Sequence, residues 1–476
     1  MRSFPVLKLP ACVLVGFFLL ALATAGPCSA RNVRFASTQL IASGIDQPKC
    51  IATADLNHDG YPDLVVTGYS DNLSVDAVSV LLNQGNGKFN PPTVYMFDFY
   101  VIGCLAVADF NGDGNLDFLV VGGDDVGNGI ALFTGDGKGN FTGPIYTPTL
   151  FAGGAISVAV GDLNKDGAND LFVGGNGSSE TIFGDGKGHF RDGAPQNAFG
   201  FDVVLDDFNA DGSLDAATAG GTSDDLFVLL GNGDGSFQNP DVYTNLGFPD
   251  GVASGDFNHD GKLDLAVSIY QDSVIETFVG NGDGTFSVGQ IGIVGAYPGK
   301  LIAADFNKDG NLDLAVANFG SNNVAVLPGM ADGSFPATQF YPTGSSPSYV
   351  ASGDFNQDGS LDLALSDYAD GTIALLQNAG GTFIKLSSSP NPSNLGEPVT
   401  FTATVVSSLD SKYKGSGSVT FVSHSQHTAP IKLVNGVATF ETAKLPEGTS
   451  RVTADYSGDN NFNPNTSKPL TQKVEP

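Results

Sequence analysis

Seven short acidic segments of one pattern recur along the chain, and their side chains are of the type that binds hard metal cations. Each segment has Asp at positions 1, 5 and 9, Asn at position 3 and Gly at position 6. Ca²⁺ takes about six to eight oxygen ligands, and Gly at position 6 permits the positive φ of a tight turn. Alternate carboxylate and amide oxygens on such a turn can therefore converge on one cation. The segments begin at Asp55, Asp109, Asp162, Asp207, Asp256, Asp305 and Asp354.

The pattern predicts about seven structural Ca²⁺ ions. Three carboxylates within nine residues repel one another, and a divalent cation relieves that repulsion. Mg²⁺ fits less well because it prefers an octahedral shell that retains several waters. The alternative is that Asp, Asn and Gly simply make good turns, which seven copies with the same three Asp positions disfavour. The expected ligands are Asp55, Asn57, Asp59, Asp63, Asp109, Asn111, Asp113, Asp117, Asp162, Asn164, Asp166, Asp170, Asp207, Asn209, Asp211, Asp215, Asp256, Asn258, Asp260, Asp264, Asp305, Asn307, Asp309, Asp313, Asp354, Asn356, Asp358 and Asp362.

The elements around these segments read as β-strands. An EF-hand needs flanking helices and a Glu at position 12, where the first and fifth segments have Val66 and Val267. Around the fifth segment, strand-like runs cover residues 251–256, 263–269 and 274–279, and a Gly-rich turn leads into a last run ending at Val294. The segments start 54, 53, 45, 49, 49 and 49 residues apart. Four antiparallel strands at that period predict the blades of a β-propeller.

Two apolar series recur in step with the segments and predict the core between blades. One lies at segment position 2 and the other opens the last strand of each repeat. The first is Leu56, Phe110, Leu163, Phe208, Phe257, Phe306 and Phe355, and the second is Phe89, Phe141, Phe190, Phe237, Phe286, Phe335 and Phe383.

The acidic segments and Gly-rich turns together resemble the FG-GAP/VCBS repeats of integrin α subunits and many secreted bacterial proteins. The resemblance covers roughly residues 33–386. It implies an all-β fold with a seven-bladed β-propeller over residues 31–386, each metal loop joining the first and second strands of a blade. Phe35 lies 20 residues before Asp55, and Phe286 lies 19 residues before Asp305. We therefore expect the N-terminal strand to join the last blade.

The two ends of the chain predict export and a second domain. Residues 1–30 have a basic start, an apolar run and small residues, as a secretory signal peptide does. We expect a secreted, cell-surface or periplasmic protein with no membrane insertion after signal removal. The Ser/Pro-rich segment 387–396 reads as a linker. Residues 397–476 alternate as strands do and resemble bacterial Ig-like domains, which implies an Ig-like β-sandwich that acts as a spacer or in adhesion.

Composition excludes one class of partner. The chain has 476 residues with 51 acidic and 21 basic side chains, for a net charge of −30. Nucleic-acid binding needs clustered Lys and Arg, so we expect none. Cys50 and Cys104 lie five residues before their segments, in the same position of adjacent repeats. A disulfide between them is compatible with export.

The face opposite the acidic segments is the expected ligand site. The residue five before each segment varies from copy to copy, and in a propeller these seven residues would form a ring. Lys300 and Tyr349 belong to this ring, at the expected mouth of the propeller channel. Four aromatics, Tyr69, Tyr270, Phe319 and Tyr368, follow the second strand of their repeats. They suit stacking on sugars or anchoring a protein; the alternative is packing between blades.

These patterns predict a calcium-binding adhesion or recognition protein whose partner is a surface glycan or an extracellular protein. No catalytic constellation is visible, so we do not expect an enzyme. The alternative is a polysaccharide lyase or hydrolase that uses Lys300 and Tyr349. A third hypothesis is a passive structural module of a surface assembly. The ligand and the oligomeric state are left open.

Overall fold

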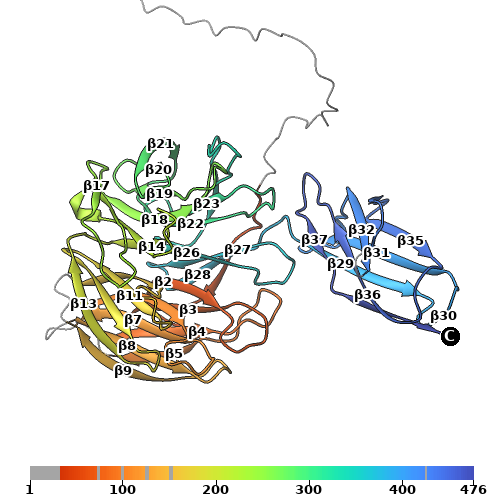
Figure 1. The fold of residues 1–476 in the computed structure, drawn as a ribbon, viewed down its shortest axis with the longest axis horizontal. Coiled ribbons are helices and arrows are strands. Elements are labelled where there is room, and N and C mark those ends of the chain that lie inside the picture. Colours follow the sequence, from red (N-terminus) through yellow and green to blue (C-terminus); the bar gives the residue numbers. More distant parts are fainter. Residues whose placement is uncertain (1–32, 72–74, 98–100, 124–127, 150–153, 424–425) are drawn as a thin grey trace, which may run out of the picture.

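The computed structural model describes residues 33–71, 75–97, 101–123, 128–149, 154–423 and 426–476. The expected signal peptide therefore lies outside the described residues. Figure 1 shows two bodies, a large one built from residues up to about 380 and a smaller C-terminal one beside it. Both are all-β, with one short 3₁₀ turn at Gly221–Ser223 among the described residues. No helix in these residues is long and apolar enough to cross a membrane.

The large body consists of four-stranded antiparallel sheets, one per repeat. Six of them pair consecutive strands. Their bounds are β2 (Gln47–Ala54), β3 (Asp63–Ser70), β4 (Val75–Leu81) and β5 (Thr93–Phe97); β6 (Val101–Ala108), β7 (Asp117–Gly123), β8 (Asn128–Gly135) and β9 (Phe141–Thr149); β10 (Ala155–Gly161), β11 (Asp170–Gly175), β12 (Ser179–Gly184) and β13 (Phe190–Gln196); β14 (Asp202–Asp206), β15 (Asp215–Ala219), β16 (Leu226–Leu229) and β17 (Asp241–Tyr243); β18 (Pro249–Gly255), β19 (Asp264–Ile269), β20 (Val274–Gly280) and β21 (Phe286–Ile293); and β22 (Pro298–Ala304), β23 (Asp313–Asn318), β24 (Asn323–Leu327) and β25 (Gln339–Pro342).

The last sheet of the large body takes its outer strand from the start of the chain. It contains β26 (Pro347–Gly353), β27 (Asp362–Asp367) and β28 (Thr372–Leu376), and β1 (Gln39–Ala42) pairs antiparallel with β28. Phe35 forms an isolated bridge with Asn378 next to this strand. The prediction that the N-terminal strand joins the last repeat is confirmed.

Neighbouring sheets interlock through the two predicted apolar series. The ring of Phe110 meets Phe190 of the next sheet edge to face at 5.8 Å, and Phe257 meets Phe335 in the same way. Phe355 of the last sheet meets Phe89 of the first at 5.7 Å. The first strands β2, β6, β10, β14, β18, β22 and β26 contact one another in this order, and β26 contacts β2.

One member of the apolar series was predicted wrongly. Phe383 is 45 % exposed, because the chain has left the large body at this point and runs into the C-terminal body. Phe35 takes the expected position instead. Its ring packs edge-on against Phe306 at 5.9 Å and Tyr341 at 5.3 Å, and only 8 % of it is exposed.

The C-terminal body places two sheets over one apolar core. The smaller sheet contains β29 (Thr382–Ser389), β31 (Val399–Ser407) and β35 (Val437–Thr442). The larger contains β30 (Ser393–Asn394), β38 (Leu470–Glu475), β36 (Gly448–Tyr456), β32 (Ser418–Ser423) and β33 (Gln426–His427), with β34 (Ile431–Lys432) and β37 (Asn465–Thr466) paired at its side. Val405, Val419, Ala454 and other alternating apolar residues fill the space between the sheets.

The expected linker at 387–396 is corrected by these pairings. Ser387–Ser389 completes β29, whose register with β31 extends from Thr382 to Ser389. Ser393–Asn394 forms β30 and pairs with β38. The Ser and Pro content suggested an unpaired segment. Instead, the backbone pairing of β29 with β31 and of β30 with β38 holds this segment in the C-terminal body. The crossing between the bodies is therefore the short stretch after Leu376.

Candidate functional site

Each acidic segment is the loop between the first and second strands of its sheet. In all seven, the first Asp directly follows the first strand and the ninth residue opens the second strand. Position 4 has a positive φ throughout: His58, Gly112, Lys165, Ala210, His259, Lys308 and Gln357. The Gly at position 6 has one as well, between 82° and 92°. Sequence reasoning found the second of these turns and missed the first, since only one copy has Gly there.

The first Asp of each loop holds the turn closed. In the first copy, the amides of Asp59 and Gly60 donate to Asp55 at 3.1 and 2.8 Å. The bond from position 6 to the first Asp recurs in all seven loops at 2.8 or 2.9 Å. The side chain of Asn57 accepts the amide of Asp59 at 3.0 Å. The carboxylates thus lie on the inside of a tight turn.

The ninth residue is a buried carboxylate clamped by backbone amides. Asp63 is fully buried and accepts the amides of Leu56 at 3.0 Å and Asn83 at 2.7 Å. Burial raises the pKa of Asp63 to about 6, and the nearby charges of Asp59 and Asp55 push it the same way against those amides. Burial likewise raises the pKa of Asp313 and of Asp362 to about 8. Each loop therefore concentrates negative charge that is partly removed from water.

The loops fit calcium in donor chemistry and not in ready-made geometry. Every side-chain donor at positions 1, 3, 5 and 9 is a carboxylate or amide oxygen, as a hard cation prefers. A buried oxygen of Asp362 has no hydrogen-bond partner. However, within the described residues no three acidic, His or Cys side chains converge as a metal-binding group. Backbone amides occupy the carboxylates instead.

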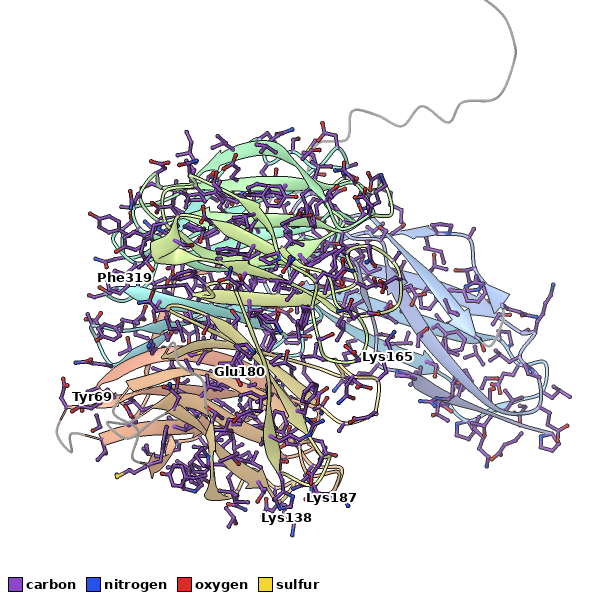
Figure 2. The ribbon with its side chains drawn as sticks, turned by 60° about the vertical axis from the view of Figure 1, so that its left-hand side comes forward. Tyr69, Lys138, Lys165, Glu180, Lys187 and Phe319 are labelled. Atoms are coloured by element: carbon purple, nitrogen blue, oxygen red, sulfur yellow. A yellow bond between two sulfur atoms is a disulfide. The ribbon has the colours of Figure 1, made fainter. Side chains whose placement is uncertain are left out.

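The first strands surround a central cavity. The cavity has a volume of about 400 Å³, and its lining comes from the first strands of all seven sheets. The ring predicted from the sequence is largely assembled here: Cys50, Cys104, Ser157, Asp202, Lys300 and Tyr349 all line it. Figure 2 shows Tyr69 and Phe319 on one side of the large body, and Lys165 of the third loop on the other side, towards the C-terminal body.

Lys300 crosses the cavity and is held on every side. Its Nζ lies 3.1 Å from a carboxylate oxygen of Asp202 and donates to the carbonyls of Asp250, at 3.0 Å, and Phe201. The same ammonium sits 5.4 Å from the ring centre of Tyr349. Three acceptors use the three N–H groups of an ammonium. Lys300 is therefore fully engaged in joining sheets of the large body, with 7 % of its surface exposed.

A missing side chain lets Lys300 reach its partner. Asp202 and Lys300 belong to β14 and β22, and β18 lies between them. Gly251 of β18 stands at the ring position, and a Cβ there would meet the Gly299 carbonyl at 2.7 Å and the Cα of Lys300 at 3.0 Å.

Burial and the charges of Asp202 and Asp250 raise the pKa of the Tyr349 hydroxyl well above its usual range. The pair nominated for catalysis thus contains a paired lysine and a tyrosine that keeps its proton.

Cys50 and Cys104 are joined as a disulfide, with their Cα atoms 5.4 Å apart. They lie on β2 and β6, the first strands of neighbouring sheets, and both are buried. The bond covalently ties the first two sheets beside the cavity.

The four predicted aromatics lie where the second strands end, at the end of each sheet opposite the acidic loops, and are half-buried. Phe319 and Tyr368, of neighbouring sheets, have ring centres 6.3 Å apart, and the Tyr368 hydroxyl donates to Gln47 at 2.6 Å. Tyr69 and Gln47 are partners in the β2–β3 register. Tyr270 stacks on Tyr297 at 4.7 Å and 17°. Part of the surface of these aromatics is therefore buried by packing between neighbouring sheets, which was the alternative to ligand binding.

Sequence reasoning missed three further aromatics on this face. Phe201, Phe248 and Tyr297 precede the first strands β14, β18 and β22. Phe201 meets Phe248 at 5.3 Å, and Phe248 meets Tyr270 at 5.4 Å. With the Tyr270–Tyr297 stack they make one continuous band, hereafter the aromatic band, which crosses three sheets. Tyr297 at its end is 48 % exposed. The sequence signal that could have identified them is an aromatic residue directly before each of these three first strands.

Comparison with known proteins agrees with this architecture. The sequence model of the FG-GAP-like repeat matches residues 55–120, 109–173, 162–218, 207–267, 256–316 and 305–365, each match running from one loop through the next. The bacterial Ig-like domain (group 3) matches residues 386–475. No curated protein sequence matches the chain.

Solved structures share the fold at low identity. A structure titled BBS1N in complex with ARL6DN, soaked with lead, has a TM-score of 0.51 at 13 % identity over 72 % of this chain and 96 % of that one. A mercury-soaked crystal of the same complex gives 0.51 at 12 % identity over the same shares. A protein from Lactobacillus plantarum gives 0.49 at 16 %, over 63 % and 86 %. By the six repeat matches, which together span most of its length, the chain belongs to the FG-GAP-like repeat family, and it ends in a bacterial Ig-like domain.

Proposed function

We propose that this chain is an exported, calcium-stabilised binding module that recognises a surface glycan or an extracellular protein. Its large body is a closed seven-bladed propeller and its C-terminal body is an Ig-like sandwich. Closure is supported by the pairing of β1 with β28, by the contact of β26 with β2 and by the Phe355–Phe89 ring contact. A ring closed in this way protects the edges of its sheets.

Calcium is proposed to bind at the seven loops through side-chain oxygens at positions 1, 3, 5 and 9. The support is the repeated all-oxygen donor set and the mutual repulsion that raises the pKa of Asp63, Asp313 and Asp362 beyond the effect of burial. When bound, the ion supplies positive charge that offsets this repulsion. Its role is structural, and the sixth and seventh loops bond to the C-terminal body.

The binding face is the face opposite the acidic loops, and the aromatic band carries this assignment. Tyr297 exposes about half of its surface while its ring is held flat against Tyr270. A rigid, half-exposed aromatic surface presents contact area at little conformational cost, as sugar-stacking and hot-spot residues do. Variation among loops on a regular scaffold is where specificity resides. Lys300 and Tyr349 shape the floor behind the band rather than perform chemistry, because Lys300 is fully paired.

The test is binding of the mature chain to glycan and extracellular-protein arrays in calcium buffer. Tyr297→Ala and Tyr270→Ala are expected to weaken capture about tenfold or more, as truncation of an aromatic hot spot does. Tyr413→Ala is the matched control, since Tyr413 is 58 % exposed on the C-terminal body. Capture that survives both band variants refutes this face. Absence of any ligand on the arrays supports a passive structural module instead.

A further inference from the structure

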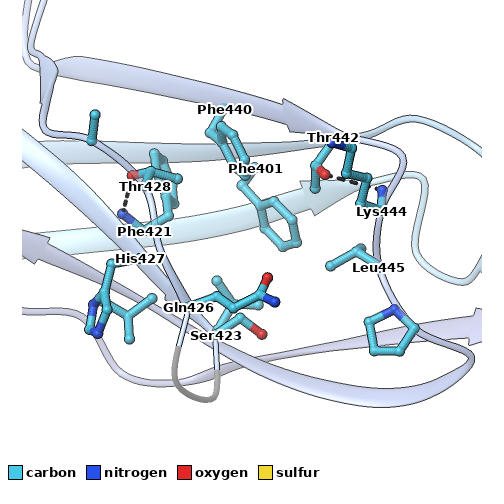
Figure 3. A pocket seen from close by; sticks show the side chains of 14 residues that line it. Phe401, Phe421, Ser423, Gln426, His427, Thr428, Phe440, Thr442, Lys444 and Leu445 are labelled. Atoms are coloured by element: carbon cyan, nitrogen blue, oxygen red, sulfur yellow. Dashed lines mark hydrogen bonds between the residues drawn. The ribbon is translucent and has the colours of Figure 1, made fainter.

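The C-terminal body contains a pocket that the propeller site does not use. It has a volume of about 700 Å³ and lies between the two sheets, where the edge strand β35 of one faces the β32–β33 hairpin of the other (Figure 3). Small-molecule pockets typically have volumes of about 300–1,000 Å³. The pocket lies beside the loop after Thr442, and Lys444, Leu445 and Pro446 of this loop line it.

The interior of the pocket is aromatic and preformed. The rings of Phe421 and Phe440 lie parallel, 6.0 Å apart at 28°, and Phe401 packs against Phe421 at 6.4 Å. Phe401 and Phe421 are buried, whereas Phe440 is partly exposed. Hydrogen bonds between Thr428 and the backbone of Phe421, both 3.0 Å, hold one wall. An apolar group can enter without unfolding this core.

The charge at the rim differs from that of the rest of the molecule. In a chain with 51 acidic and 21 basic residues, the described residues that line this pocket include no Asp or Glu. Their ionisable members are His427 and Lys444, both exposed. Figure 3 shows Phe401 at the centre, with Lys444 and Leu445 on one side and His427 on the other. The rim thus offers the ammonium of Lys444 above an apolar floor.

We propose that this pocket binds an amphiphilic anion, meaning an apolar acyl or aromatic body with a carboxylate at one end. The body lies against Phe401, Phe421 and Phe440, and the carboxylate points to Lys444. Burial of the CH₂ groups of the body favours binding, and the ammonium selects the anion over neutral or cationic analogues. Such a ligand comes either as a free acid or as part of a lipid surface.

The full chain itself supplies a clean reporter, because it contains no Trp. Ala429 lines the pocket and is exposed, so Ala429→Trp introduces a single indole at the rim. Titration with dodecanoate below its micelle concentration is expected to change the emission saturably. Dodecanol and dodecyltrimethylammonium are expected to bind at least about fivefold more weakly, which is the scale of one exposed charge interaction.

Two variants in the reporter background separate the charge from the cavity. Lys444→Gln is expected to weaken dodecanoate about fivefold and to leave dodecanol unchanged. Phe440→Ala is expected to weaken both. Lys432→Gln is the matched control, since Lys432 is an exposed lysine of the same body that does not line the pocket. A far-ultraviolet spectrum and a melting curve establish that each variant is folded.

Three outcomes overturn the proposal. The first is an emission that dodecanoate does not change up to millimolar concentration. The second is equal binding of the anion, the alcohol and the cation, which removes the assigned role of Lys444. The third is binding to anionic phosphatidylglycerol vesicles without binding of free dodecanoate, which places the interaction on the surface rather than in the pocket. Binding to both forms supports the proposal and identifies a lipid as an accessible source.

Discussion

The side-chain amide of Asn463, in the C-terminal body, donates a buried 3.0 Å hydrogen bond to the backbone carbonyl of Phe306 in the sixth loop. In three other sheets a Gly of the last hairpin turn supplies the donor to the equivalent carbonyl. The last sheet lacks that turn because its chain continues into β29, and Asn463 takes the place of the Gly amide. The equivalent bonds join Gly87 to Phe355, Gly188 to Phe110 and Gly235 to Leu163, each at 2.9 Å.

The two bodies should therefore behave as one rigid unit. Asn463 also donates to Ser360 at 2.9 Å, and Asn465 donates to the carbonyls of Asp358 and Thr382 at 2.7 Å. Replacing Asn463 and Asn465 together with Ala is expected to cost about 1–3 kcal/mol of docking energy. Small-angle scattering should then show a broader distribution of distances between the bodies. Asn391→Ala is the control, because Asn391 bonds only within the C-terminal body. An unchanged distribution contradicts the rigid joint.

Phe35→Ala should destabilise the large body by about 3–5 kcal/mol, the usual cost of removing a buried Phe. Phe35 packs on Phe306 and Tyr341 and fills the last sheet from the N-terminal end. Phe383→Ala is a matched control with an expected change within about 0.5 kcal/mol, because Phe383 is exposed. Denaturant unfolding measures both. Equal effects of the two substitutions are incompatible with the exchange of roles described above.

Loss of the Cys50–Cys104 disulfide should lower the free energy of unfolding by about 2–4 kcal/mol. The bond closes a loop over a sequence separation of 54 residues and ties β2 to β6. Unfolding of the wild-type chain with and without reductant measures the effect. In the Cys50→Ala/Cys104→Ala double variant, reductant should change nothing. A reductant effect that persists there comes from another source.

Stability should rise on acidification partly through Asp367. Burial raises its pKa to about 7, although Thr372 and the amide of Gly344 oppose this. Its folded-state value lies above the unfolded one, so the folded state binds the proton first, and stability increases as pH falls from about 8 to 5. Asp367→Asn should remove on the order of 3 kcal/mol of that pH dependence. Unfolding at several pH values in saturating calcium measures the slope, and an unaltered slope contradicts the assignment.

Removal of calcium should lower the melting temperature. If each proposed site is bound with free calcium about ten times its dissociation constant, it stabilises the fold by about 1.4 kcal/mol. EDTA should abolish this, and calcium should restore it better than magnesium. The seventh loop should exchange its ion slowest, since Asp358 is fully buried and Asn356 nearly so beneath the C-terminal body. Elemental analysis that finds no bound calcium, with a melting curve indifferent to EDTA, refutes the proposed ions.

Local patterns were predicted well from the sequence, and long-range exchanges were not. The loops and the strands of the fifth repeat follow from short motifs, and the pairing of the N-terminal strand follows from the spacing of Phe35. The segment 387–396 and Phe383 were misassigned because only the pairing of β29 with β31 shows where the propeller chain leaves its sheet. Phe201, Phe248 and Tyr297 were missed because the segments before the first strands differ in length between repeats.

The pairing of β1 with β28 also sets the order in which the chain can fold. Gln39 pairs with Leu375, so the strand synthesised first must wait for a partner made roughly 330 residues later. At ribosomal speeds of about 5–20 residues per second, that delay lasts tens of seconds. Throughout this interval β1 lacks its partner strand, and the last sheet is completed only after translation of the final repeat.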